Sequence, residues 1–270
     1  MVNTSTYLIK RLAAIAMTAM ITAAIQLPAF AGKVSVASGV YRTPVVELYT
    51  SEGCSSCPQA DQWVSKLGDA LSGEFHAVPL AFHVDYWNYL GWEDPFSRPE
   101  FTERQRDLAA INKQRGIYTP QFAVSGRETR GTSAVVQAIQ SANAEIAAVT
   151  IKMDLNASEN GQVSAAFNIE NTADVAELYI AVYENDISRP IGSGENSGKT
   201  LHHDFVVRHW VRAAALPTGL YQGDHALKLE QDWQLQNLGL AAVVIDRPSG
   251  KTLQAVSISL AELFPGIEES

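Results

Sequence analysis

The sequence has few cysteines and a shortage of basic residues. Its 270 residues include two cysteines, and 20 Lys and Arg stand against 29 Asp and Glu. Because Cys54 and Cys57 lie close together in the chain, no disulfide can join distant segments, and the framework that stabilises small disulfide-rich domains is missing. The basic residues form no cluster that would attract a phosphate backbone, so we predict no nucleic-acid partner.

The amino terminus also lacks a hydrophobic run long enough for an ordinary membrane span. Lys10 and Arg11 precede a weakly polar run from Leu12 to Leu27, which the small-residue pattern Ala29-Phe30-Ala31 follows. This arrangement is typical of a signal peptide, here residues 1–31, although a retained anchor is the alternative. We therefore expect a periplasmic or secreted mature protein without a membrane span after cleavage. Loss of Lys10 and Arg11 would leave 18 basic and 29 acidic residues, a net charge of −11.

The hydrophobic pattern changes once along the mature chain. Residues 32–43 have the composition of a flexible lead-in, and the following segment, 44–148, alternates strand-like and helix-like patterns. From residue 149 to residue 270 the apolar residues recur with a period of two, separated by turn signals. We predict an α/β domain over 44–148, followed by a mostly antiparallel, β-sandwich-like domain over 149–270.

The α/β segment predicts a definite order of elements. We expect strands at residues 45–49, 77–84 and 117–124, and helices at residues 58–71, 99–114 and 133–148. This is the order of a thioredoxin-like fold.

The two cysteines form a Cys-x-x-Cys motif between the first predicted strand and helix. A thiolate at Cys54 would lie at the helix N-terminus, where free backbone N–H groups and the helix dipole lower a cysteine pKa to about 3.5–7.5. Pro58 suits the first helical turn, where its missing N–H costs nothing. We expect Cys54 at an exposed turn and Cys57 to be less accessible.

Metal binding is the main alternative for this motif. Structural zinc sites commonly use two pairs of ligands, and the chain has no second cysteine pair. A periplasmic copper- or zinc-binding function that uses Cys54, Cys57 and His83 is therefore an alternative. A third possibility is a non-catalytic protein-interaction module in which the β-rich half binds a partner.

Several stretches of the chain resemble a known family, the secreted bacterial thioredoxin-like proteins grouped as domain of unknown function 1223. The stretches are Val45 to Pro58, Phe82 to Trp87, Leu90 to Trp92, Asp94 to Phe96, Tyr118 to Gln121, Gly194 to Gly198 and Leu201 to His203. The resemblance covers nearly the whole mature chain. It is specific for the family and does not supply a substrate.

The further similarity to thioredoxin implies a thiol-disulfide oxidoreductase of the cell envelope. In that role Cys54 attacks, Cys57 resolves the mixed disulfide, and a cis Thr119-Pro120 bond brings Pro120 to face them. The redox-active disulfide Cys54–Cys57 serves in place of an organic cofactor. The implied partners are protein thiols or disulfides and a redox partner.

Three further residues are candidates for proton transfer. Thioredoxin has a buried acid six positions before its first cysteine, where this chain has Leu48, and Glu47 lies one position earlier. His83 and Asp85 end the second predicted strand, and period-two spacing puts both on one face. Glu47, His83 and Asp85, with Thr119, are therefore the candidates to support the cysteine chemistry. The alternatives are a solvated strand-end glutamate at Glu47 and a hydrogen-bonded structural histidine at His83.

Other polar and aromatic clusters receive a structural interpretation. The Gly194 to Lys199 segment has the composition of a shaped turn, and we assign no metal site to His203 and its neighbours. We interpret five aromatic residues after the second strand as sealing that loop onto its own domain, with a groove for extended protein as the alternative. They are Tyr86, Trp87, Tyr89, Trp92 and Phe96.

Overall fold

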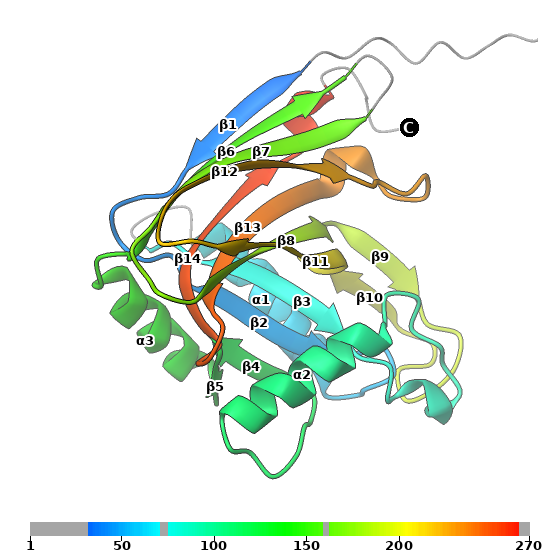
Figure 1. Ribbon diagram of the computed structural model, residues 1–270. Coiled ribbons are helices and arrows are strands. Elements are labelled where there is room, and N and C mark those ends of the chain that lie inside the picture. The colour runs from blue at the N-terminus through cyan, green and yellow to red at the C-terminus, as the bar shows by residue number, and fades with distance from the viewer. Residues whose placement is uncertain (1–31, 71–74, 159–161, 265–270) are drawn as a thin grey trace, which may run out of the picture.

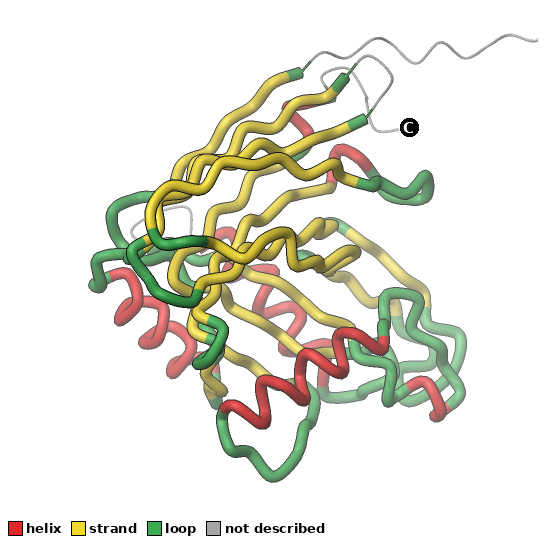
Figure 2. Tube along the Cα trace, viewed as in Figure 1, coloured by secondary structure: helices red, strands yellow, loops and turns green. Residues whose placement is uncertain are grey.

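A computed structural model describes residues 32–70, 75–158 and 162–264, so the predicted signal peptide lies outside the described residues. Within them the protein is β-rich, with 14 strands and three α-helices (Figures 1 and 2). No helix in these ranges combines the length and the apolar character that crossing a membrane requires. The helices are α1 (Cys57–Ala70), α2 (Pro99–Ile111) and α3 (Thr132–Asn143).

The strands form three sheets. The largest has the order β14-β13-β8-β11-β3-β2-β4-β5, the second β1-β6-β7-β12, and the smallest pairs β9 with β10. The strands are β1 (Lys33–Ala37), β2 (Val45–Thr50), β3 (Val78–His83), β4 (Gln121–Val124), β5 (Arg127–Thr129), β6 (Val149–Ala157), β7 (Val163–Asn171), β8 (Ala176–Glu184), β9 (Ile187–Pro190), β10 (Thr200–His203), β11 (Val206–Leu216), β12 (Gly219–Leu227), β13 (Leu238–Asp246) and β14 (Lys251–Ser259).

The first half of the chain supplies the four strands at one end of the eight-stranded sheet, β3-β2-β4-β5. β2 and β3 are parallel, and β4 and β5 continue the sheet antiparallel on the other side of β2. Every element predicted between residues 45 and 148 is present, with ends shifted by a few residues. The largest shift is in α3, which ends at Asn143 rather than at residue 148.

Helices cover both faces of this part of the sheet. The alternation along β2 directs Val46 and Leu48 toward α1 and α3, where they pack with Val64 and Ile139. The neighbouring Tyr49 faces the opposite side and packs in the core that contains Phe101 and Leu108 of α2. The end of β2 is thus enclosed by helices on two sides.

The second half of the chain is largely antiparallel, and its strands divide between two sheets. The four-stranded sheet packs over β8, β13 and β14, and Figure 1 shows it as an upper layer with the helices below. Along β8, Leu178 and Ile180 face this layer while Ala181 and Tyr183 face the core shared with α2. A strand covered on both faces in this way is buried along its length.

One strand joins the two halves. β11 lies parallel to β3, with Val206 opposite Ala81, and the Ala81 amide donates to the Phe205 carbonyl at 2.8 Å. The predicted boundary at residues 148 and 149 falls between α3 and β6, yet the eight-stranded sheet runs through both segments. The second half is therefore not a sandwich built only from its own strands.

The predicted flexible lead-in over residues 32–43 is wrong where the chain forms a strand. Lys33–Ala37 forms β1 and pairs antiparallel with β6, Lys33 opposite Asn156. Tyr41 makes a further bridge to Ile146. The reason is visible in the sequence, because Val34 and Val36 alternate with polar residues and pack against the upper core.

Candidate functional site

The two cysteines form a disulfide in the turn between β2 and α1. The Cα atoms are 5.4 Å apart and the sulfurs are bonded at 2.11 Å. The turn is held by its own backbone, since the Cys54 amide donates to the Ser51 carbonyl and the Cys57 amide to the Cys54 carbonyl, both at 3.2 Å. Gly53 is needed for packing, because a Cβ there would lie 3.1 Å from Cβ of Trp87.

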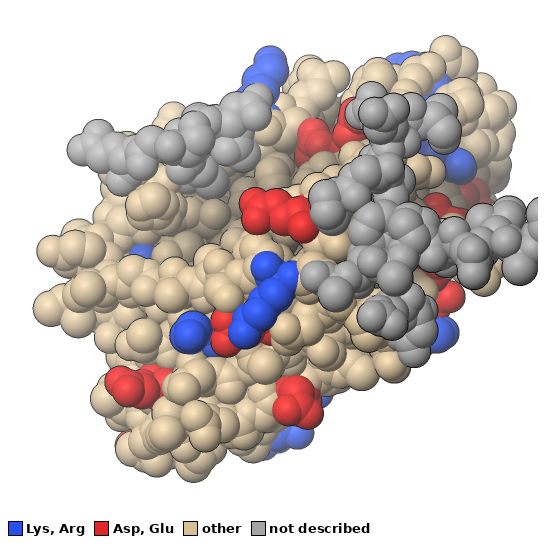
Figure 3. Space-filling model, turned by 90° about the horizontal axis from the view of Figure 1, so that it is seen from above, with Lys and Arg blue, Asp and Glu red and all other residues tan. Residues whose placement is uncertain are grey.

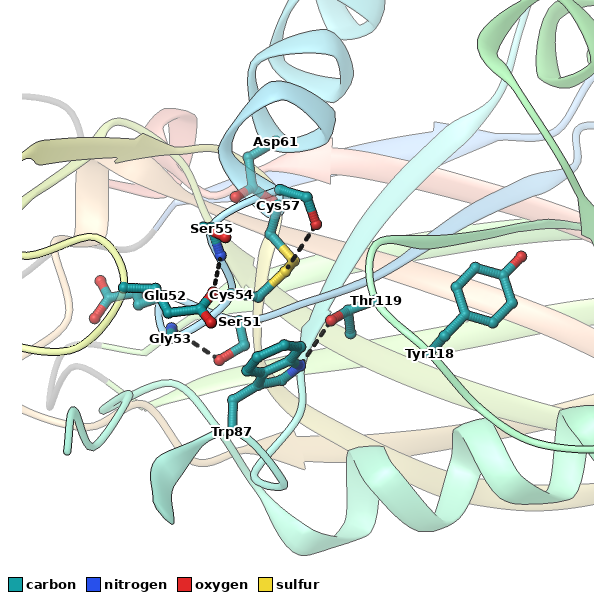
Figure 4. Close-up of a disulfide and its surroundings, with 12 residues drawn as sticks. Ser51, Glu52, Gly53, Cys54, Ser55, Cys57, Asp61, Trp87, Tyr118 and Thr119 are labelled. Carbon is teal, nitrogen blue, oxygen red and sulfur yellow. Dashed lines mark hydrogen bonds between the residues drawn. A yellow bond between two sulfur atoms is a disulfide. The ribbon is translucent and has the colours of Figure 1, made fainter. Parts of the chain in front are cut away.

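The expectation that Cys54 lies at an exposed turn is wrong. Both cysteines are 0% exposed, while Ser55 and Ser56 between them face solvent. Trp87 lies beside the disulfide, and its indole N–H donates to the Thr119 hydroxyl at 2.7 Å (Figure 4). Neither sulfur is accessible in this conformation.

A segment from the second half of the chain closes the turn from another side. We call residues 194–198, between β9 and β10, the cap segment. The buried amide of Asn196 donates to the carbonyls of Glu52 at 2.9 Å and Cys54 at 3.0 Å. Glu195 accepts the Ser55 amide at 2.9 Å, in the turn two residues before α1 begins. The cap segment was predicted as a shaped turn, and its contact with the cysteines was missed.

The Thr119-Pro120 peptide bond is cis, as the resemblance implies. β4 begins directly after it, and Gln121 pairs with Tyr49 of β2. Pro120 therefore comes next to the end of β2, on the side from which the cysteine turn emerges. Figure 4 shows Thr119 beside the Trp87 indole, to which its hydroxyl is hydrogen-bonded, on the side of the disulfide that faces Tyr118.

The aromatic residues after β3 mostly seal this region. Trp92 donates its indole N–H to Glu52 at 2.7 Å, and Tyr86 donates to Gln105 of α2 at 3.2 Å. Phe96 is buried against the His83 ring, while Tyr89 is 81% exposed. Apart from Tyr89, the structural interpretation of this cluster agrees with these contacts.

His83 and Asp85 do not share a site. His83 is fully buried, and its Nδ1 lies 2.7 Å from Oδ2 of Asp94, which also accepts the Glu52 amide at 2.9 Å. Asp85 accepts the Thr102 hydroxyl of α2 at 2.6 Å instead. The period-two expectation fails because β3 ends at His83, after which the chain turns.

Glu47 is also directed away from the cysteine helix. Its carboxylate accepts two bonds from Arg104 of α2, at 3.0 and 2.9 Å, and one from the Tyr49 hydroxyl at 2.7 Å. Leu48, its neighbour, faces α1. The buried acid on the α1 side is Asp61, which belongs to the helix itself and lies beside Cys57 in Figure 4.

A cluster of buried ionisable groups adjoins the cysteine turn through Glu52 and Asp61. They are Glu52, Asp61, His83, Asp94 and His203, none more than 7% exposed. The His83 and His203 rings are 5.2 Å apart and meet edge to face. Within the described residues, no group of three or more His, Cys, Asp or Glu side chains has the geometry of a metal site, and both cysteine sulfurs are engaged with each other.

Burial and charge act against each other in this cluster. Burial opposes ionisation of Asp94, but His83 and the amides of Glu52 and Phe96 together lower its pKa below the usual value. Burial likewise opposes the charge of His83, but Asp94 is the main reason that its pKa is raised. Burial raises the pKa of Asp61, against the attraction of His203 and His83.

These shifts predict a pH-dependent cost for Asp94→Asn. The stability from Asp94 is present above its ordinary pKa and is lost as the pH falls through its lowered folded value. The stability from His83 is present below its ordinary pKa and is lost as the pH rises through its raised folded value. Urea unfolding should show the greatest cost from about pH 4 to about pH 6.5, between the ordinary pKa values of the two groups, and a smaller cost at alkaline pH. A cost that does not change with pH would contradict a charged pair.

Comparisons with known proteins agree on the family and the fold. A family model described as "Protein of unknown function (DUF1223)" matches residues 45–245. The crystal structure of protein AGR_C_4864 from Agrobacterium tumefaciens is 22% identical, with a TM-score of 0.62, over 82% of this chain and 96% of that chain. HBP35 of Porphyromonas gingivalis is 18% identical, with a TM-score of 0.64, over 86% of this chain and 80% of that chain. No curated protein matches the chain. At these identities, the solved structures support a shared fold and nothing further.

Proposed function

Since the chain belongs to the DUF1223 family, whose description assigns no activity, we propose its function from the site itself. The protein is a thiol-disulfide oxidoreductase that acts through Cys54 and Cys57. The observation that carries this proposal is the Cys54–Cys57 disulfide at the start of α1, in a chain with no other cysteine. A disulfide between residues three positions apart closes a very short loop, so it contributes little to the stability of the fold. Redox chemistry therefore explains this disulfide better than stabilisation does.

The arrangement around the disulfide supports a thioredoxin-like assignment for residues 44–148. Parallel strands β2 and β3, antiparallel strands β4 and β5, and the helices between them follow the expected order. The cis Pro120 comes before β4, on the side where the cysteine turn emerges. A thiolate at Cys54 would lie at the N-terminus of α1, where the helix dipole favours negative charge.

The reaction has two exchange steps. With the disulfide oxidised, a substrate thiolate attacks Cys54, forms a mixed disulfide, and releases Cys57 as the leaving sulfur. A second substrate sulfur then attacks the mixed disulfide, so the substrate becomes a disulfide and Cys54 becomes a thiol. In the reverse direction Cys57 attacks Cys54 and expels the substrate. Because both cysteines are buried, either direction requires the cap segment or Trp87 to move aside.

We further propose a periplasmic or secreted location, with protein thiols or disulfides as substrates and a separate redox partner. An oxidising compartment is where a disulfide in a resting protein persists. Nucleic acid is not proposed as a partner. On the face in Figure 3, the described Lys and Arg side chains are scattered among acidic ones.

Trapping of the mixed disulfide tests this function. Cys57→Ser removes the resolving sulfur, so envelope extract incubated with this reduced variant should give higher-mass adducts on a non-reducing gel, and these should disappear on reduction. Cys54→Ser is the matched control and should give few adducts.

The other outcomes identify the alternatives. Adducts mainly from Cys54→Ser would reverse the two roles. Adducts from neither variant, with one zinc or copper ion bound per reduced wild-type chain, would favour the metal-binding function. Adducts from neither variant without bound metal would favour the interaction module.

A further inference from the structure

Three ionisable side chains beside the disulfide are buried without full hydrogen bonding. Glu52, Asp61 and His203 are 0%, 7% and 2% exposed. Both ring nitrogens of His203 and Oε1 of Glu52 lack a hydrogen-bond partner in the described structure. Buried polar atoms of this kind are destabilising, so several in one place indicate a role other than stability.

The His203 ring lies between two carboxylates. Its Nε2 is 3.4 Å from Oε1 of Glu52, and its Nδ1 is 3.7 Å from Oδ2 of Asp61. Imidazole can take a proton at one nitrogen and release one from the other. Both separations exceed a hydrogen bond, and a small displacement of the ring shortens either one. His203 is thus placed to connect the two acids.

Of these three side chains, Asp61 is the one that lies next to Cys57. It lies one helical turn after Cys57 on α1, so both side chains project from the same face of the helix. Side chains in a helix also lean toward the N-terminus, which directs Asp61 over the turn that begins with Cys57. Figure 4 shows the two side by side. Because Cys57 is fully buried, solvent is not in contact with its sulfur in the closed conformation.

We propose that Asp61, His203 and Glu52 form a buried proton relay for Cys57. The inference deepens the proposed function and rests on it. When Cys57 attacks the mixed disulfide, its S–H proton passes to the Asp61 carboxylate, a Cys57–Cys54 bond forms, and the bond from Cys54 to the substrate sulfur breaks. The substrate leaves with the electron pair of that bond. In the opposite direction Cys57 leaves as a thiolate and takes its proton from the Asp61 carboxyl.

The surroundings of the relay favour this exchange. Burial raises the pKa of Asp61 toward that of a thiol, against the attraction of His203 and His83, and Asp94 adds to the rise. The nearby Thr50 side chain of β2 acts in the opposite direction. Glu52 is held by the Trp92 indole at 2.7 Å and faces Arg189 of β9 at 3.7 Å. An acid of raised pKa is a better proton partner for a thiol than an ordinary aspartate.

A two-phase titration with Ellman's reagent tests the relay. Reduced wild-type protein should release one chromophore when Cys54 attacks and a second when Cys57 resolves the mixed disulfide. Asp61→Asn should slow the second phase at neutral pH by at least about tenfold and leave the first phase within about twofold. The pH profile of its second phase should follow ionisation of the Cys57 thiol alone. His203→Gln, which keeps a polar side chain at this position but cannot titrate, should slow the same phase.

Controls separate this idea from the proposed function and from loss of structure. Glu177→Gln removes another buried carboxylate, on β8, and should leave both phases unchanged. If Asp61→Asn does not fold, the rate of the second phase in His203→Gln tests the relay in its place. A second phase of unchanged rate and pH profile in the folded variants would overturn the relay while leaving the oxidoreductase intact. Absence of the second phase in wild type would instead contradict the proposed function. One zinc or copper ion per wild-type chain, lost in Asp61→Asn, would replace the relay with a metal site.

Discussion

Glu47→Ala should lower the free energy of unfolding by about 3 kcal/mol, because it leaves the Arg104 guanidinium in a largely buried position without its partner. The Arg104 side chain is 19% exposed and that of Glu47 is 2% exposed. Arg104 also lies over the Trp210 ring, 4.3 Å from its centroid, so it cannot simply turn out to water. Removing one partner of a buried ion pair costs about 3–5 kcal/mol, and we expect the lower value here because Arg104 is partly exposed.

Urea unfolding of the variant measures this cost. Glu103→Ala is the matched control on the same helix, since Glu103 pairs with Arg106 at the surface, with side chains 64% and 54% exposed. Its cost should stay below about 0.5 kcal/mol. Equal costs for the two substitutions would show that the Glu47 pair is no more important than a surface pair.

Asn196→Ala should increase the rate at which dithiothreitol reduces the Cys54–Cys57 disulfide by roughly 30-fold. The variant loses the two bonds from the Asn196 amide to the carbonyls of Glu52 and Cys54. At about 1 kcal/mol each, the loss favours opening of the cap segment by about 2 kcal/mol, which corresponds to this change in rate when opening precedes reaction.

Ser197→Ala provides the control for this prediction. Ser197 lies in the same segment, but its hydroxyl donates to the Gly192 carbonyl at 3.3 Å, two residues before the segment, and not to the cysteine turn. Reduction of this variant should proceed at the wild-type rate. If Asn196→Ala also reacts at the wild-type rate, the sulfurs become accessible by movement of Trp87 instead.

The elements of the first half could be predicted because their signals are local. Apolar runs mark β2 and β3, Pro99 marks the start of α2, and a Cys-x-x-Cys motif between a strand and a helix marks the redox centre. The cis Thr119-Pro120 bond followed from the resemblance rather than from physical reasoning about the sequence.

The surroundings of the disulfide could not be predicted in the same way, because they come from distant segments. Asn196 binds the Cys54 carbonyl across 142 positions, and no periodicity specifies such a contact. The acid near Cys57 was sought on a strand, but Asp61 lies on the helix, one turn after Cys57 and on the same buried face. The signal that was present was the Gly194 to Gly198 stretch, because it is one of those that resemble the family although it lies far from the cysteines in the sequence.

The single pairing of β11 with β3 also has a consequence during synthesis of the chain. Until Val206 has left the ribosome, β3 is an edge strand of the sheet, and the backbone of Ala81 has no partner on that side. Unpaired edges of this kind associate with other chains. The first half is therefore exposed to aggregation until Val206, 58 positions after residue 148, is in place, and a fragment that stops near residue 148 would carry the same edge permanently. A holdase chaperone that covers β3 during this interval would increase the yield of folded protein.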